Sequence, residues 1–244
     1  MDVGELCGGL EREARELGAD FFGVADLEPA RPAILEQGGP AVAAFPRAVS
    51  VGIALPHAIV DQLPRRSERA VAMSYRHQAY DVVNQRLDHL VSRLAGRLQR
   101  AGYRALPVPP SQTVDTRQLR GAFSNKLAGH LAGLGWIGRS CLLVTPQSGP
   151  RVRWASVLTA APLVSTGRPM APQCGECREC VDRCPAGAFT GRLFREEEPR
   201  ELRFDVHKCK AYLDQTEQAG GLPVCGMCLY ACPRGRDASA RLSA

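Results

Sequence analysis

Two cysteine-rich stretches decide how the C-terminal part of this chain is organised: residues 174–185 read CGECRECVDRCP and residues 224–233 read VCGMCLYACP. The first has the spacing C-x2-C-x2-C-x3-C-P, whereas the second has only C-x2-C-x3-C-P and is one cysteine short. A loop with the first spacing wraps three thiolates around one [4Fe–4S] cube, and the fourth cysteine, followed by Pro, opens a helix and binds the neighbouring cube. The pattern therefore predicts two [4Fe–4S] clusters that exchange ligands.

The spacing divides the C-terminal cysteines into two quartets. By symmetry with the first stretch, the last cysteine of the second stretch returns to cluster I, so cluster II lacks one ligand. The lone cysteine of FDVHKCKAYL, at position 209, is left in this region to supply it. We interpret the fifteen residues between it and the second stretch as a loop insertion, which costs little because loop-closure entropy grows logarithmically with length. The predicted ligands are Cys174, Cys177, Cys180 and Cys232 for cluster I, and Cys184, Cys209, Cys225 and Cys228 for cluster II.

Tetrahedral zinc is the alternative for paired CxxC motifs. The two Cys-Pro steps favour iron–sulfur clusters, because a zinc site has no use for a cysteine that reaches a neighbouring site. Without an export signal, clustered cysteines also favour metal binding over disulfides. The other two cysteines are expected to be unreactive core thiols, since Cys7 falls on the apolar face of a predicted helix and Cys141 in an apolar strand.

Composition is that of an ordinary soluble globular protein, with 45% hydrophobic and 23% charged residues among 244. No apolar run approaches the roughly 18 residues of a membrane helix, and the N-terminus is acidic and amphipathic where a signal peptide would be basic and then apolar. We therefore expect a cytoplasmic protein with no membrane segment. The net charge of +6 permits an anionic partner such as RNA. However, 28 of the 31 basic residues are Arg, and a general preference of the genome for Arg explains this excess equally well.

Hydrophobic periodicity predicts an α+β sandwich of sheet and helices ahead of the cysteines. Helices are expected at 3–17 and 75–102 and, as a short helix, within 124–136. Strands are expected at 20–27, 48–55, 103–108, 140–145 and 152–160, the last two joined by PQSG as a hairpin. A composition shift at STGRPMAPQC predicts two domains, residues 1–165 and 166–244.

The segment directly before the cysteines, residues 123–163, reads FSNKLAGHLAGLGWIGRSCLLVTPQSGPRVRWASVLTAAPL. It resembles the epoxyqueuosine reductase family, whose members share an AGLGWIGK-like turn, a paired strand and the same cysteine pattern with the extra lone cysteine. The resemblance is clear from about residue 100 to 235 and continues upstream in ELGADFFGVA and YRHQAYDVVNQRLD. That family and its relatives, the reductive dehalogenases, imply a nitroreductase-like α+β domain that binds cobalamin, followed by a bacterial-type two-[4Fe–4S] ferredoxin module.

The resemblance also implies roles for particular residues. The glycine turn is expected to shape the wall around a large planar cofactor, because glycine permits torsions and close approach that a side chain forbids; these positions are Gly133, Gly135, Trp136 and Gly138. Tyr75 and Lys126 are the expected proton donors, since both fall in segments that align with cofactor-facing regions of the family. His77, Tyr80 and His130 lie near them and are alternatives.

The resemblance fails at two places. The family has a VDxAP-type segment with an acidic proton donor, which corresponds to Leu119 here, and Asp115 is nearby but out of register. The chain also stops at residue 244, without the helical-repeat extension that the family uses on tRNA. Both departures argue against epoxyqueuosine reduction as the reaction.

We therefore expect an iron–sulfur, cobalamin-dependent reductase that takes electrons from a low-potential donor of the ferredoxin or flavodoxin type and reduces a small molecule or nucleoside. Its protein part would position the corrin, exclude water and supply a proton. The alternatives are a ferredoxin-like electron carrier and a corrinoid-handling protein without a substrate of its own. Binding to tRNA is a third, for which salt-dependent affinity would be the signature.

Overall fold

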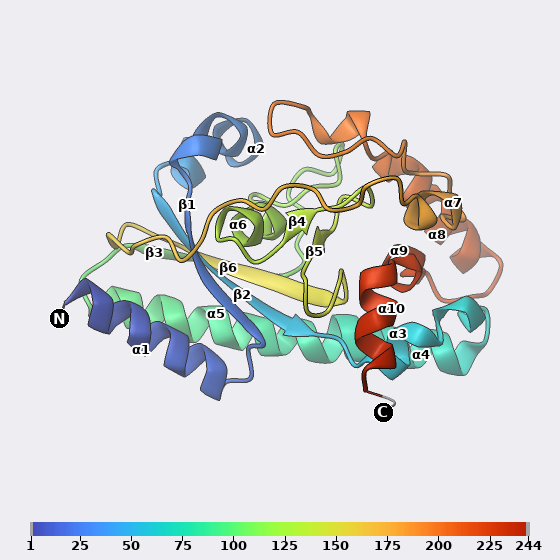
Figure 1. Ribbon diagram of the computed structural model, residues 1–244, viewed down its shortest axis with the longest axis horizontal. Helices are drawn as coiled ribbons and strands as arrows, with labels where there is room; N and C mark the ends of the chain where they lie inside the picture. Colours follow the sequence, from blue (N-terminus) through green and yellow to red (C-terminus); the bar gives the residue numbers. More distant parts are fainter. Residues whose placement is uncertain (1, 243–244) are drawn as a thin grey trace. The chain divides into compact units, whose positions relative to one another are not determined.

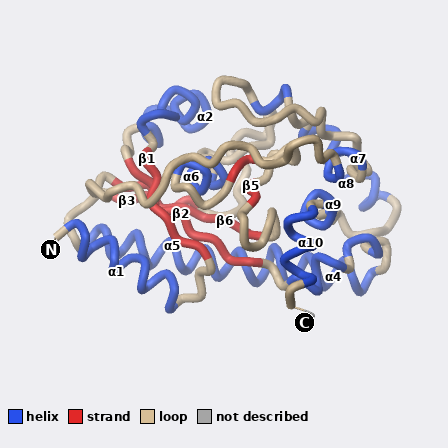
Figure 2. Tube along the Cα trace, in the orientation of Figure 1, coloured by secondary structure: helices blue, strands red, loops and turns tan. Residues whose placement is uncertain are grey.

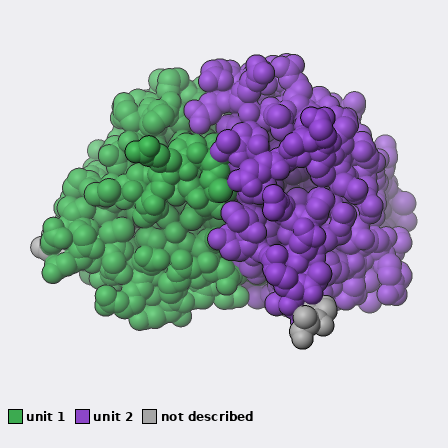
Figure 3. Space-filling model, viewed as in Figure 1, with its two compact units in different colours: residues 1–53, 83–135, 153–170 green, residues 54–82, 136–152, 171–244 purple. Residues whose placement is uncertain are grey.

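The computed structural model describes residues 2–242, which form two compact units (Figure 3). Unit 1 comprises residues 1–53, 83–135 and 153–170, and unit 2 comprises 54–82, 136–152 and 171–244. The units cross the boundary that composition places near residue 165, because two earlier segments pack with the cysteine-rich region. The assignment of functional domains to 1–165 and 166–244 stays a prediction.

Unit 1 centres on a four-stranded sheet with the order β1-β2-β6-β3. Its strands are β1 (Phe21–Asp26), β2 (Arg47–Ala54), β3 (Ala105–Val108) and β6 (Val152–Thr159). The β1–β2 and β3–β6 pairs are antiparallel, with Phe21 opposite Gly52 and Ala105 opposite Thr159. Almost every residue of β1, β2 and β6 is buried, so both faces of the sheet are covered.

Helices supply that cover and confirm the predicted α+β class. In Figure 1, α1 (Val3–Glu16) and α5 (Val83–Arg100) run side by side below the strands, and α6 (Asn125–Leu131) lies above them. Asp2 and Glu5 form a capping box that fixes the start of α1, and Ser124 caps α6 by accepting from Leu127 N–H. Unit 1 also contains η1 (Glu28–Ala30) and α2 (Arg31–Ala43).

Unit 2 consists mainly of short helices joined by long loops (Figure 2). Ahead of the cysteines it contains α3 (His57–Asp61), the 3-10 turn η2 (Leu63–Arg65), α4 (Arg69–Arg76), the π-helix η3 (His77–Val82), β4 (Trp136–Ile137) and β5 (Leu143–Val144). The cysteine-rich region contains α7 (Glu179–Asp182), η4 (Arg200–Leu202), α8 (Val206–Gln218), α9 (Met227–Ala231) and α10 (Pro233–Ala240). Within residues 2–242, no helix combines the length and apolarity needed to cross a bilayer.

Two predicted elements differ from the structure. The helix expected over 75–102 begins earlier, at Arg69, and is divided by the π-helical turn. The hairpin expected between 140–145 and 152–160 is wrong, because β5 pairs with β4 and β6 joins the four-stranded sheet. Cys141 has a φ of 55°, and its N–H donates to Gly138 O, so a tight turn folds β5 back onto β4.

Candidate metal centre

The first quartet brings together both ends of the cysteine-rich region. Cys174 and Cys177 lie in the loop before α7, Cys180 lies on α7, and Cys232 comes from the start of α10. Burial raises the pKa of Cys180 to about 12, and the charges of Cys232, Cys174 and Cys177 add to that rise. Because thiolates perturb one another in this way only at short range, the four sulfurs predicted for cluster I lie together.

The Cys-Pro step at the start of α10 gives Cys232 its surroundings. Cys232 is the N-cap and Pro233 takes the first helical position, where a missing N–H costs nothing. Burial raises the pKa of the Cys232 thiol, while hydrogen bonds from the N–H groups of Arg234 and Gly235 act in the opposite direction. The helix expected after a Cys-Pro step is confirmed here, and its first N–H groups favour negative charge at the sulfur.

A buried arginine anchors α10. Arg151 is fully buried, and its Nη2 lies 2.7 Å from an Asp61 carboxylate oxygen. The Ser239 hydroxyl, on α10, donates to the same carboxylate. Gly235 fits closely against this arrangement, since a Cβ there would lie 2.6 Å from Arg151 Nε. The position of Cys232 therefore depends on contacts between α10 and segments far away in the sequence.

The second quartet is assembled from three separate stretches. Burial raises the pKa of Cys209 to about 11, and the charges of Cys225 and Cys184 add to the rise. Burial also raises the pKa of Cys228, with further contributions from Cys225, Cys209 and Cys184. These four cysteines are the set predicted for cluster II. The charge of Cys180, in the first quartet, also adds to the raised pKa of Cys228, so the two quartets are neighbours.

Local contacts join the Cys184 and Cys209 segments. The Phe189 and Phe204 rings stack with their centroids 5.1 Å apart, and their backbones form a β-bridge. Asp205 N–H donates to Ala188 O at 2.8 Å, and Ala188 N–H donates to Cys184 Sγ at 3.4 Å. This pairing lets a cysteine outside both motifs reach the second quartet.

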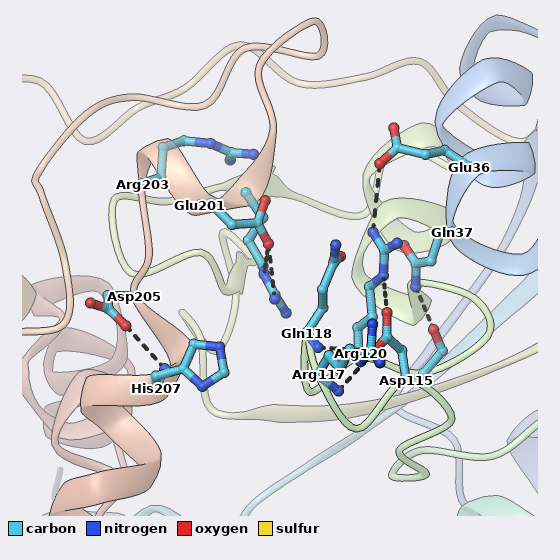
Figure 4. Close-up of polar contacts among 12 residues, drawn as sticks. Glu36, Gln37, Asp115, Arg117, Gln118, Arg120, Glu201, Arg203, Asp205 and His207 are labelled. Atoms are coloured by element: carbon cyan, nitrogen blue, oxygen red, sulfur yellow. Dashed lines mark hydrogen bonds and ion pairs between the residues drawn. The ribbon is translucent and has the colours of Figure 1, made fainter.

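Two details of the predicted site need correction. The fifteen residues between Cys209 and Cys225 are not simply a loop insertion, because Cys209 lies in the first turn of α8 and the helix continues to Gln218. Asp205 caps this helix by accepting from Lys208 N–H and from His207 N–H (Figure 4). After Cys184 the chain makes a turn instead of a helix. Gly187, whose N–H donates to Cys184 O, has a φ of 55° and ends the turn.

The donor set of each quartet fits a [4Fe–4S] cluster, for which four cysteine thiolates are the usual ligands. Among residues 2–242, no three His, Cys, Asp or Glu side chains are grouped to hold a single metal ion. The raised pKa values keep the metal-free thiols protonated, so cluster binding must release protons. The assignment of each cysteine to a particular cluster stays a prediction that these electrostatic groupings support.

The two remaining cysteines lie outside both quartets. Cys7 is half-buried on α1, and burial, followed by the charge of Glu11, raises the pKa of its thiol. Cys141 is buried, in the tight turn between β4 and β5 rather than in the strand that was expected. Both thiols have the surroundings of packing residues.

The glycine turn is packed against the chain itself. Gly133 has a φ of 76°, and a Cβ there would lie 3.0 Å from backbone atoms of Arg168. At Gly138 a Cβ would lie 2.9 Å from Val144 and 3.6 Å from Cys174 Sγ. Direct contact of this turn with a cofactor therefore stays a prediction, because packing alone explains both glycines.

The rest of the turn is also in contact with neighbouring protein groups. Trp136 is buried, with the Arg234 guanidinium over its ring, and the buried carbonyl of Gly135 lies 3.1 Å from His130 Nδ1. Arg139 follows the turn and donates to Gly175 O at 2.6 Å, between the first two cysteines of the first quartet. The turn thus leads directly into the loop that carries the cluster I ligands.

The two expected proton donors lie in different units. Tyr75, in unit 2, is 2% exposed and packs against the second cysteine stretch, since a Cβ on Gly226 would lie 2.8 Å from its hydroxyl. Lys126, in unit 1, is half-buried on α6. Of the alternatives, His77 is exposed and lies 3.6 Å from Asp81, and Tyr80 packs edge-on against Tyr75. His130 is buried on α6, with its ring against the Gly135 carbonyl.

The loop at the position of the family's acid contains Asp115, which accepts from Arg117 and Gln118 N–H at 2.9 Å (Figure 4). These backbone hydrogen bonds and the Arg120 guanidinium hold the pKa of Asp115 below its ordinary value. A general acid must hold its proton near neutral pH, so Asp115 is unsuited to that role. Leu119 is strained, with a φ of 47°.

Sequence comparison places this site in a defined class: residues 173–235 match the family described as the 4Fe-4S double cluster binding domain. Among curated proteins, the chain is similar to epoxyqueuosine reductases. It is 31% identical to that of Bacillus anthracis over 162 residues, which cover 61% of this chain and 38% of the relative. Against that of Bacillus subtilis (strain 168) it is 27% identical over 208 residues, covering 78% and 48%. A tetrachloroethene reductive dehalogenase of Sulfurospirillum multivorans is 32% identical over 114 residues, covering 42% and 22%.

Solved structures share the fold. A catabolic reductive dehalogenase in complex with 3-bromo-4-hydroxybenzoic acid matches with a TM-score of 0.68 at 23% identity, over 93% of this chain and 31% of that one. An epoxyqueuosine reductase with an epoxyqueuosine-modified tRNA stem loop matches with a TM-score of 0.62 at 21% identity, over 96% and 66%. The predicted resemblance is confirmed. The chain spans 38% and 48% of the length of the two curated epoxyqueuosine reductases.

Proposed function

We propose that this chain is an iron–sulfur reductase in which electrons pass through two [4Fe–4S] clusters to a bound corrinoid that reduces a small molecule or nucleoside. The observation that carries the proposal is the pair of neighbouring cysteine quartets: α7, which carries Cys180, packs against α9, which carries Cys228. Two adjacent clusters form a relay for single electrons, and a relay requires both a donor and an acceptor. A ferredoxin or flavodoxin of low potential is the proposed donor.

The proposed acceptor is cobalamin, on the grounds of similarity. One structure with a TM-score of 0.68 to this chain is described as a reductive dehalogenase with a mechanism for B12-dependent dehalogenation. When bound, the clusters would supply single electrons and the corrinoid a strongly reducing cobalt. The residues of this chain have the tasks of holding the clusters through eight cysteines and of fixing the cluster loop through Arg139. Tyr75 and Lys126 stay the proposed proton donors.

A corrinoid-handling protein, which binds and reduces the cofactor for another enzyme, is a second candidate. The acid loop favours it, because Leu119 stands where the family has its acid and the pKa of Asp115 is held low by its own loop. Such a protein would lose nothing without a proton donor. Substrate turnover separates the two candidates, since only the reductase consumes a substrate in proportion to the electrons supplied.

An anaerobic titration of the iron-reconstituted protein with cob(II)alamin tests the proposal. We expect base-off cobalamin in the visible and EPR spectra at one equivalent per chain. Absence of cobalamin binding in a protein that holds both clusters would contradict the proposal and leave a ferredoxin-like electron carrier. Affinity for tRNA that falls steeply with salt would instead indicate a nucleic-acid substrate.

A further inference from the structure

We propose that Arg66 raises the reduction potential of cluster II. The proposal rests on the proposed function, because it takes two bound clusters as given. It concerns a residue outside both cysteine motifs, more than 100 positions before the first of them.

The Arg66 guanidinium is held beside α8. Arg66 follows the 3-10 turn η2, and its Nη2 donates to the Tyr212 hydroxyl at 3.0 Å. The guanidinium carbon also lies 5.9 Å from the centre of the Tyr212 ring. Tyr212 is three residues after Cys209 on α8, so both side chains lie on neighbouring parts of one helix face. Arg66 is thereby held beside a helix that carries a cluster II ligand.

Arg66 also lies near the segment of Cys225, another ligand of the same quartet. The turn η2, just before Arg66, packs against α9, which begins two residues after Cys225. Burial raises the pKa of the Cys225 thiol, and a backbone hydrogen bond from Met227 and the charge of Arg66 act in the opposite direction. Arg66 Nε is buried with no hydrogen-bond partner in the described part of the chain. The segments are packed closely here, since a Cβ on Gly226 would lie 2.7 Å from Leu63 Cδ1. The Arg66 cation therefore lies beside the second quartet.

The thiols of the first quartet are influenced by other groups. The hydrogen bonds that act on Cys232 come from backbone N–H groups of Arg234 and Gly235. The leading influences on Cys180, after burial, are the other cysteines of its quartet. Neither of these thiols has a cation among the influences on its pKa, although the Arg139 guanidinium lies at the loop between Cys174 and Cys177.

The consequence follows from charge. Reduction adds one negative charge to a cluster, and both a nearby cation and a hydrogen bond to sulfur stabilise that charge. Arg66 should therefore make cluster II easier to reduce. Cys177 of the first quartet is exposed, which suits cluster I as the point of electron entry.

Potentiometric titration followed by EPR tests this proposal on the anaerobically reconstituted protein and its Arg66→Gln variant. We expect at least a tenfold loss in the equilibrium constant for reduction of one cluster, a shift of about 59 mV for a one-electron couple, and no shift of the other. Arg65→Gln is the matched control, because it removes the same charge from the adjacent residue. Arg65 is largely exposed and pairs with Glu68 at 2.7 Å, so this control should shift neither potential.

Unchanged potentials in Arg66→Gln, or equal shifts in both arginine variants, would overturn the proposal. If Arg66→Gln loses iron, Arg66→Lys and Tyr212→Phe replace it: the lysine should retain most of the potential, and the phenylalanine should lower it slightly. In that case a further variant without the cation, Arg66→Met, is measured as well. The proposal is overturned if Tyr212→Phe shifts neither potential and Arg66→Met keeps the wild-type potential of cluster II. The measurement needs no cobalamin, so failure to bind cobalamin contradicts the proposed function alone, whereas a wild type with one cluster contradicts both.

Discussion

The two cysteine quartets have the same ligands but are built differently. The first closes a loop against the start of α10, where two backbone N–H groups meet the Cys232 sulfur. The second takes Cys209 from α8, beside which the Arg66 guanidinium is held by the Tyr212 hydroxyl. Equal ligand sets can therefore give unequal clusters, because the groups around the sulfurs, and not the sulfurs themselves, distinguish one potential from the other.

The largest effect is expected from removing the ligand that is particular to the second quartet. Cys209→Ala should abolish or truncate cluster II while cluster I persists, because Cys184, Cys225 and Cys228 alone cannot complete a four-thiolate cube. Iron content should fall below about eight per chain, with one reduced-cluster EPR signal retained. Cys7→Ala is the control and should keep both clusters. Full iron content in Cys209→Ala would show that another group completes cluster II.

A smaller effect is expected from loosening the support of the first quartet. Asp61→Asn should weaken the attachment of α10 and destabilise the protein by about 1–3 kcal/mol, because Arg151 stays buried without an anionic partner. Urea unfolding measures the change. Cluster I should also lose iron to a chelator faster than cluster II, and equal rates for both clusters would contradict the separate support proposed here.

The same carboxylate predicts a dependence on pH. Burial raises the pKa of Asp61, but the Ser239 hydroxyl and Arg151 together lower it by more than burial raises it. The pKa of Asp61 is therefore below its ordinary value. The unfolded chain then binds the proton more readily, and this contribution to stability is present above about pH 4 and lost as pH falls below it. The pKa of His57 is also lowered, by burial and by Arg151, so its contribution is lost in a separate step as pH falls below about 6.5. Asp61→Asn should flatten the dependence of the unfolding free energy on pH below about pH 4.

Much of the candidate site could be predicted from sequence because cluster chemistry restricts cysteine spacing. The eight ligands and their grouping follow from two short motifs and one leftover cysteine. The helix around Cys209 could also have been found, since Asp205 stands at the position of an N-cap. The turn at Cys141 could not, because a positive φ at a residue other than glycine leaves no mark in the sequence.

The remaining features depend on contacts between distant segments. The sequence around Arg66 does not indicate that this residue lies near Cys225, which is 159 positions later. The two residues come together only in the folded chain. The buried pair of Arg151 and Asp61 is equally hidden, as is the packing of residues 54–82 with the cysteines. The sequence could therefore predict the candidate cluster ligands, but not the distant residues that pack beside them.

The most direct test of the central claim is the metal content and low-temperature EPR spectrum of the wild-type protein, reconstituted and reduced without oxygen. Two neighbouring quartets predict about eight irons per chain, little zinc, and a spectrum broadened by coupling between two reduced [4Fe–4S] clusters. About four irons with one uncoupled signal, or stoichiometric zinc in place of iron, would contradict the account.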